Sequence, residues 1–220
     1  MTPARRGSPG PRPPRAMSPD LPAVLDAGEL APRADLMGTL IDAPTGAASA
    51  AHGRIAESRI ASASVDRLDL TGTGLSDVAI DQIKAVELIA RDGAWRGVEI
   101  SGGRIGTLDG LRAEWDGVVL RGIRIDYLSL PSAEIGDLLV VDCEIGTLDV
   151  PEARLTRVRF ERSRADEVDT RGLRAVDLDL RGLEALSYTD PRGLTGATLD
   201  ARQAELHAAA FADALGIRIA

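Results

Sequence analysis

Apolar residues recur along most of the chain at alternating spacings of three and two residues. When residues 64–183 are written as six rows of 20, the apolar sites fall at positions 2, 5, 7, 10, 12, 15, 17 and 20. At those sites 42 of 48 residues are apolar, against 10 of the other 72. This spacing is neither the 3.6-residue period of a helix nor the two-residue period of a long strand. It predicts very short strands, each with two inward residues around one outward residue, separated by turns.

The constant row length predicts a solenoid. Residues 104–163 contain three consecutive copies, which begin Arg-Ile-Gly-Thr-Leu, Arg-Ile-Asp-Tyr-Leu and Glu-Ile-Gly-Thr-Leu. Repeats of this size without insertions are typical of folds in which each unit packs only on its neighbours. Four five-residue faces would close one coil, and stacking at about 4.8 Å per coil would give a six-coil rod of roughly 30 Å. The expected fold class is therefore all-β, a quadrilateral β-helix.

Glycine and aspartate recur where this coil must turn. Both residue types tolerate tight or left-handed backbone. Twelve of these corner positions are Gly72, Asp77, Asp92, Gly97, Gly102, Gly117, Gly122, Asp137, Asp142, Gly172, Asp177 and Gly182.

Several chemically distinctive residues fall at inward positions of the rows. Trp95 and Trp115 share position 12 of adjacent rows, so we expect their indoles to stack inside the rod. Cys143 occupies inward position 20, and we interpret it as a buried structural thiol rather than a nucleophile.

The repeat resembles the pentapeptide-repeat family, whose A-(D/N)-L-x-x unit builds a right-handed quadrilateral β-helix. The resemblance is strong over 64–183 and weak over 34–63, and this chain departs from the family by carrying Leu or Val at the small first position. Matching segments are Ala34-Asp35-Leu36, Leu68-Asp69-Leu70, Leu148-Asp149-Val150, Val168-Asp169-Thr170 and Leu178-Asp179-Leu180. A leucine-rich-repeat-like binding module is the alternative, but that fold expects an Asn or Cys ladder and the chain contains no Asn.

Four segments are expected along the chain. Residues 1–20 carry arginines and prolines and are predicted to be a disordered basic tail, with Met17 as an alternative start and contact with an acidic partner as the functional alternative. Residues 21–63 are predicted to be an irregular lead-in with incomplete first coils, in which Pro44-Thr45-Gly46 and the following alanines and serines form a loop. The β-helix is expected over 64–199.

A different element is predicted at 200–216. Asp200 and Gln203 have the spacing of a capping box, and Gly216 suits a helix stop. This C-terminal helix would either cap the last coil or form a homodimer contact, as the resemblance implies, because gyrase-protecting family members dimerise through a C-terminal module. The expected contacts on one helical face are Ala204, Ala208, Phe211 and Leu215.

Composition limits the functional classes. The net charge of −8 argues against direct binding of nucleic acid, which normally requires a basic surface. One cysteine fits a reducing cytosol, so a cytoplasmic location is expected, and no apolar run approaches the roughly 20 residues of a membrane helix. His52 and His207 lack the spacing of a metal site. We therefore expect no enzyme activity and no cofactor.

The outward residues are what remain for function. The sequence predicts an acidic column of outward aspartates. It also predicts a basic cluster of arginines, which argues against a uniformly acidic surface. The candidate interaction residues are Asp69, Asp109, Asp149 and Asp169 in the column, and Arg157, Arg159 and Arg162 in the cluster. The favoured hypothesis is a scaffold that binds a protein partner. The alternative implied by the resemblance is a DNA mimic that binds DNA gyrase or another type II topoisomerase. A third hypothesis is direct DNA binding through the arginines and the tail.

Overall fold

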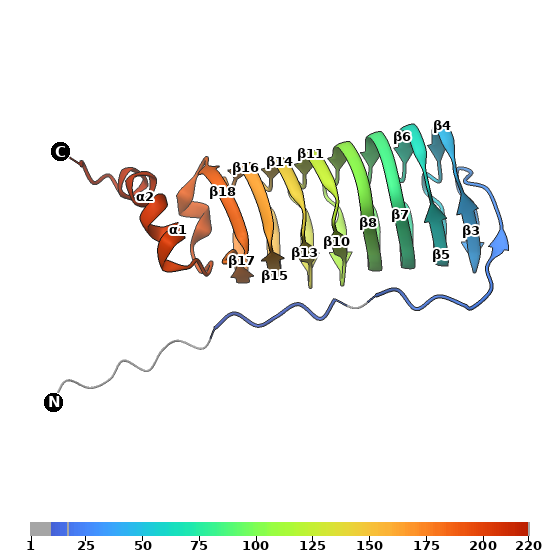
Figure 1. Ribbon diagram of the computed structural model, residues 1–220, viewed down its shortest axis with the longest axis horizontal. Helices are drawn as coiled ribbons and strands as arrows, with labels where there is room; N and C mark the ends of the chain where they lie inside the picture. The colour runs from blue at the N-terminus through green and yellow to red at the C-terminus, as the bar shows by residue number, and fades with distance from the viewer. Residues whose placement is uncertain (1–9, 17, 220) are drawn as a thin grey trace.

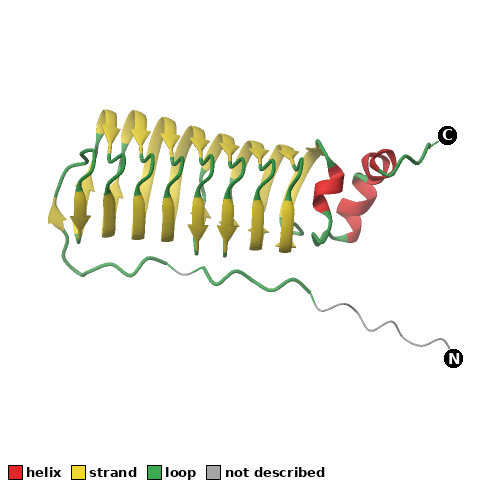
Figure 2. Cartoon of the chain, turned by 180° about the vertical axis from the view of Figure 1, so that it is seen from behind, coloured by secondary structure: helices red, strands yellow, loops and turns green. Residues whose placement is uncertain are grey.

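A computed structural model describes residues 10–16 and 18–219. They form a rod of stacked β-coils with short helices at one end (Figure 1, Figure 2). The described strands belong to one sheet, their pairings are parallel, and the solenoid makes about eight turns. The predicted all-β β-helix with a C-terminal helical region is confirmed, with more coils than the six expected.

The strands follow the coil path in chain order. The first turns contain β1 (Asp26–Ala27), β2 (Asp35–Met37), β3 (Thr39–Asp42), β4 (Thr45–Ser49), β5 (Arg54–Ala61) and β6 (Ser64–Asp69). The middle contains β7 (Gly74–Ile89), β8 (Ala94–Asp109), β9 (Glu114–Asp116), β10 (Val119–Arg121), β11 (Arg124–Ser129), β12 (Glu134–Gly136) and β13 (Leu139–Val141). The last turns contain β14 (Glu144–Asp149), β15 (Arg154–Glu161), β16 (Ser163–Asp169), β17 (Arg174–Asp179) and β18 (Leu183–Tyr188).

The predicted 20-residue register holds from β6 to β18. Leu108 of β8 pairs with Leu128 of β11, which pairs with Leu148 of β14. The register continues to Tyr188, which pairs with Val168. Residues at one row position therefore lie above one another along the rod, and each inward column is a continuous stack of buried side chains.

The corners have the backbone that the glycines and aspartates predicted. Of the twelve expected positions, all except Gly182 have a positive φ, between 52° at Asp137 and 70° at Gly117. Arginines at Arg112, Arg157 and Arg162 occupy equivalent left-handed corners. Because such a φ is unfavourable for a long side chain, the contacts around these arginines must hold the backbone in place.

The β-helix begins earlier than predicted. The first coils expected within 21–63 are present, but they are more regular than predicted, since β2 and β3 both pair with β5 at an offset of 19 residues. The segment predicted to be a loop after Pro44 is strand β4, which pairs with β6 across a register shift between Gly46 and Ala47. The first coils are therefore one residue short, which moved their apolar residues out of the 20-residue rows.

The N-terminal segment is ordered where it is described. Residues 10–16 and 18–25, named here the strap, run extended beside the coils (Figure 1). The prediction of a disordered tail over 1–20 is therefore wrong for these residues, and its remainder, including Met17 as an alternative start, lies outside the described residues. Polar contacts described below hold the strap, in place of a β-ladder.

The interior packs as predicted. The rings of Trp95 and Trp115 are buried and stacked, with centroids 4.9 Å apart and planes 9° from parallel. Cys143 is buried, and its thiol donates to the carbonyl oxygens of Val141 and Leu120 at 3.2 and 3.4 Å. Burial raises the pKa of this thiol, which disfavours the thiolate that a nucleophile would need.

The C-terminal end consists of three short helices rather than one longer helix. They are the 3₁₀ helix η1 (Pro191–Leu194), α1 (Ala201–Leu206) and α2 (Ala208–Ala214). The capping box between Asp200 and Gln203 is present, as predicted. The single helix predicted over 200–216 is interrupted at His207, where the chain turns and the imidazole packs edge-on against Tyr188, with ring centroids 4.9 Å apart.

Candidate interaction surfaces

The predicted acidic column lies along one face of the rod, where each aspartate ends a strand, but other residues interrupt it and its carboxylates bond to nearby groups of the chain. Between Asp69 and Asp169, the same position is Ile89 in one coil and Ser129 in another. Asp69 accepts hydrogen bonds from the backbone N–H and hydroxyl of Thr71 at 3.0 and 2.6 Å, and Asp109 accepts from the N–H of Leu111 at 3.1 Å. These carboxylates therefore stabilise the turns that follow them.

Neighbouring side chains also donate hydrogen bonds to the carboxylates of the column. Arg91 donates to Asp109 at 2.7 Å, and Arg171 donates to Asp169 at 2.8 Å. Asp149 instead accepts from the hydroxyl of Tyr127 at 2.9 Å. The four carboxylates are half-buried or buried, so they do not form a row of exposed negative charges.

The pKa shifts in this column follow from these contacts. Burial opposes ionisation of Asp69, but the hydrogen bonds from Thr71 still lower the pKa of its carboxyl. The guanidinium of Arg171 lowers the pKa of Asp169 more simply, by donating to its charged form. Both groups are therefore ionised at neutral pH and already have partners.

The predicted arginine cluster is neutralised by neighbouring coils. Arg157 donates from two nitrogens to Asp137 at 2.6 and 2.7 Å, and Asp137 is almost fully buried beneath it. Arg162 makes the same paired contact with Asp142 at 2.7 and 2.9 Å on an exposed corner. Arg159 lies 3.3 Å from Asp179. The cluster is a set of ion pairs rather than an unpaired basic patch.

Two of these pairs, together with Asp92 and Arg112, follow one rule, which we name the corner ladder. An aspartate at a left-handed corner binds the arginine 20 residues later, which lies at the same corner of the next coil. Guanidinium and carboxylate groups fit one another in two parallel hydrogen bonds, so adjacent coils are joined side chain to side chain as well as by backbone. The pairs are Asp92 with Arg112, Asp137 with Arg157, and Asp142 with Arg162.

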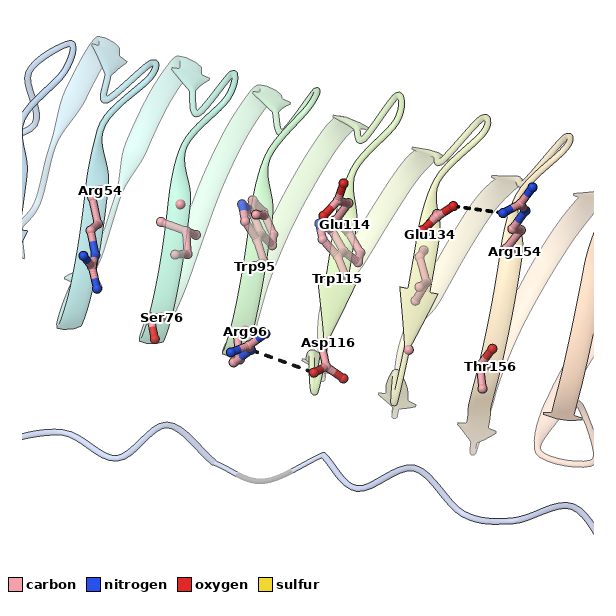
Figure 3. Close-up of a pocket in the computed structure, with 15 residues that line it drawn as sticks. Arg54, Ser76, Trp95, Arg96, Glu114, Trp115, Asp116, Glu134, Arg154 and Thr156 are labelled. Atoms are coloured by element: carbon pink, nitrogen blue, oxygen red, sulfur yellow. Dashed lines mark hydrogen bonds and ion pairs between the residues drawn. The ribbon is translucent and has the colours of Figure 1, made fainter.

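A hollow of about 660 Å³ lies on the rod face formed by β5, β7, β8, β9, β12 and β15 (Figure 3). Charged side chains border it in pairs, with Arg154 3.2 Å from Glu134 and Arg96 3.9 Å from Asp116. The two indoles lie beneath it within the coils, and neither Nε1 has a hydrogen-bond partner among the described residues. The hollow is wide and open.

The C-terminal helices present two different surfaces. On the inner side, Gln203 donates to the carbonyl oxygens of Leu180 and Leu183 at 2.8 and 2.7 Å, and Phe211 packs against the core. These contacts satisfy backbone groups that the last coil would otherwise expose, as a solenoid cap must.

The predicted contact face of these helices is only partly correct. Of its four residues Phe211 faces the core, whereas Ala204, Ala208 and Leu215 are exposed and do not cover the last coil. Their alternative role as dimer contacts stays a prediction. The larger apolar side chains exposed at this end are Leu206 (67%), Leu215 (73%), Ile217 (56%) and Ile219 (68%).

Two of these features were missed from the sequence. The corner ladder has a signal, since acids and arginines alternate at a separation of 20, but it can be read only after the corners are assigned. The strap has a weaker signal, because its prolines indicate only that it cannot join a β-ladder. The aspartates that it contacts are 57 to 165 residues away, which no local pattern reveals.

Searches for a metal site or a membrane-spanning helix in the described residues, and for related proteins, gave no match. Among residues 10–16 and 18–219, no group of three or more His, Cys, Asp or Glu side chains is arranged to hold a metal ion. None of the helices in this part of the chain has the length and apolar character needed to cross a bilayer. No protein-family model matches the chain, and no curated protein matches it.

Proposed function

We propose that this protein is a non-catalytic interaction scaffold of the pentapeptide-repeat type whose C-terminal end binds another protein chain, most simply a second copy of the rod. The observation that carries the proposal is the group of exposed apolar side chains Leu206, Leu215, Ile217 and Ile219 beside the cap. Large apolar side chains that are exposed near one another in the chain are more typical of a protein interface than of a solvated surface.

The rest of the described surface supports a scaffold rather than an enzyme. The outward charges are largely used in inter-coil ion pairs, and the large hollow is open and bordered by paired charges. The rod is a rigid support on which a terminal contact can be displayed at a fixed distance from other surfaces.

Sedimentation velocity over a wide concentration range tests the proposal. We expect the wild-type chain to self-associate, and Leu215→Arg with Ile217→Arg to remain monomeric. Val86→Arg is the control, since Val86 is also an exposed apolar residue (66%) but lies on β7. A strict monomer at every concentration would remove the second copy as partner.

Binding to DNA gyrase is the alternative that remains as a prediction. It requires exposed carboxylates at a spacing that imitates phosphates, and the pairing of Asp109 with Arg91 and of Asp149 with Tyr127 does not favour it. A supercoiling assay decides between the hypotheses. Mimicry predicts inhibition or protection by the wild-type protein and a weaker effect of Asp109→Lys with Asp149→Lys.

A further inference from the structure

The strap crosses the coils along one corner of the rod, from the last coils toward the first (Figure 1). The part of this corner that runs from Asp77 to Asp177 is named here the strap corner. The N–H of Arg12 donates to Asp177 at 3.1 Å and its Nε donates to the same carboxylate at 2.7 Å. The N–H of Arg15 donates to Asp137 at 2.9 Å, and that of Asp20 lies 3.5 Å from Asp77. The residues of the strap corner are Asp77, Gly97, Gly117, Asp137, Arg157 and Asp177.

The spacing of these contacts identifies the conformation of the bound segment. Arg12 and Arg15 are three residues apart, and their partners Asp177 and Asp137 are two coils apart. Two coils at about 4.8 Å each give about 3.2 Å per strap residue, close to the rise of about 3.1 Å in polyproline II. Pro11 and Pro14 are half-buried at the three-residue period of that helix, while Arg12 and Pro13 are more exposed.

The prolines also limit which backbone N–H groups of the strap can donate to the corner carboxylates, because proline has no N–H. Between Pro11 and Arg15, only Arg12 and Arg15 retain a backbone N–H, and each donates to a corner carboxylate. A segment held in polyproline II loses little conformational entropy on binding, which is why proline-rich peptides are common ligands. Recognition therefore uses two N–H groups and one guanidinium at fixed spacing.

The strap corner extends the corner ladder in a specific way. Asp137 already binds Arg157 of the next coil, but the residue 20 positions after Asp177 is Ala197. Arg12 of the strap supplies the guanidinium that the last coil lacks. At Gly97, an added Cβ would lie 2.8 Å from a carboxylate oxygen of Asp77, so this glycine leaves room for the carboxylate that Asp20 of the strap approaches.

We propose that the strap corner is a recognition site for extended segments that contain arginine and proline, and that the chain's own strap is its intramolecular ligand. A partner protein with a segment of the same chemistry binds the site by displacing the strap. Displacement is feasible because the polar contacts are few and the Arg12 side chain is 67% exposed, so tethering rather than contact strength keeps the strap in place.

The test uses the full chain with its strap released. Arg12→Glu places a carboxylate against Asp177, and Arg15→Pro removes the N–H that Asp137 accepts. The probe is a fluorescein-labelled synthetic peptide with the sequence of residues 10–25, followed by fluorescence anisotropy. We expect salt-sensitive binding to the strap-released chain that is about tenfold tighter than to the wild-type chain, whose site is occupied.

Matched variants establish where the peptide binds. Asp177→Asn added to the strap-released chain should weaken binding about tenfold, because Asp177 makes the side-chain contact with Arg12. Asp142→Asn is the control, since Asp142 is also a left-handed corner aspartate that binds an arginine, Arg162. Equal binding to the wild-type and strap-released chains, equal effects of the two Asn variants, or no binding to the released chain would overturn the proposal.

A second measurement does not depend on the released variant. Trypsin should cut the bond after Arg15 about tenfold faster in Asp177→Asn than in the wild-type chain, and at the wild-type rate in Asp142→Asn. Mass spectrometry of the fragments identifies the cut bond. Equal rates in all three proteins would show that Asp177 does not hold the strap.

Discussion

At the residue scale, the volume of the side chain determines which residues fit the interior of the rod. The left-handed backbone determines which residues fit the corners. The inward residues could be predicted from apolar spacing alone, because each must contact its neighbours in the coils above and below. The hydrogen-bond partners of the polar groups could not be predicted in this way. Whether Asp69 points into solvent or back to Thr71 depends on a local hydrogen bond that apolar periodicity does not encode.

The Trp95 indole is the first test at this scale. Trp95→Ala removes a fully buried ring from its stack on Trp115 and leaves a cavity between rigid coils. We expect a loss of about 3–5 kcal/mol in the free energy of unfolding, measured in urea. Val176→Ala, at an exposed site on β17, should change it by less than about 0.5 kcal/mol. Emission from both indoles should be blue-shifted, and water-like emission would contradict the assigned register.

Tyr188 gives a prediction about alkaline pH. Burial beneath His207 raises the pKa of its phenol from 10.0 to about 12. The folded-state pKa lies above the unfolded value, so this group's contribution to stability is complete below pH 10 and is lost between pH 10 and about 12. Absorbance titration should show phenolate formation delayed beyond pH 10, and Tyr188→Phe should remove the later step. A normal titration of both tyrosines would show that Tyr188 is not buried.

At the element scale, adjacent coils are joined by backbone ladders and, at three corner pairs, by arginine and aspartate side chains. The two kinds of contact differ in how well they can be predicted from the sequence. The backbone ladder follows from the 20-residue register, whereas the strength of each ion pair depends on its burial. The same spacing produces a nearly buried pair at Asp137 and an exposed pair at Asp142.

Because the two pairs differ in burial, the same substitution should reduce stability by different amounts at the two corners. Arg157→Ala leaves the carboxylate of Asp137 nearly buried without its guanidinium partner, and we expect a loss of about 2–3 kcal/mol in stability. Arg162→Ala should cost about 1 kcal/mol or less, because Asp142 can be solvated. Both arginines have a left-handed backbone, with φ of 55° and 45°, so the backbone effect largely cancels. Similar losses in urea unfolding would show that burial does not set the strength of these pairs.

The acid dependence of the buried pair has a definite sign. Arg157 lowers the pKa of Asp137 below 3.8, so the pair stabilises the rod above that pH and its contribution is lost as the pH falls through the lowered pKa. Stability measured from pH 6 down to pH 2 should fall less steeply in Arg157→Ala than in the wild-type chain. Parallel curves would contradict this linkage.

At the scale of the whole molecule, the sequence predicted the repeating part and failed where the repeat is broken. The coils over 64–183 follow from one period, but the first coils lack one residue at Gly46 and Ala47 and so appeared irregular. The strap and the inner contacts of the helices depend on a few long-range hydrogen bonds, such as those from Arg12 to Asp177 and from Gln203 to Leu180. Contacts of this kind have no periodicity from which they could be predicted.

Because coils contact only their neighbours, the rod should tolerate the loss of one whole coil. Deletion of 104–123 joins Gly103 to Arg124 in register, places Trp95 against Ile135, and preserves the strap contacts with Asp137 and Asp177. We expect a folded, cooperative rod with reduced stability, measured by circular dichroism and urea unfolding. Deletion of 104–113 is the control, since half a coil leaves the next strands opposite the wrong faces, and it should abolish cooperative unfolding. If both deletions behaved alike, stability would not be a sum of neighbouring interfaces and the rod would fold as one indivisible unit.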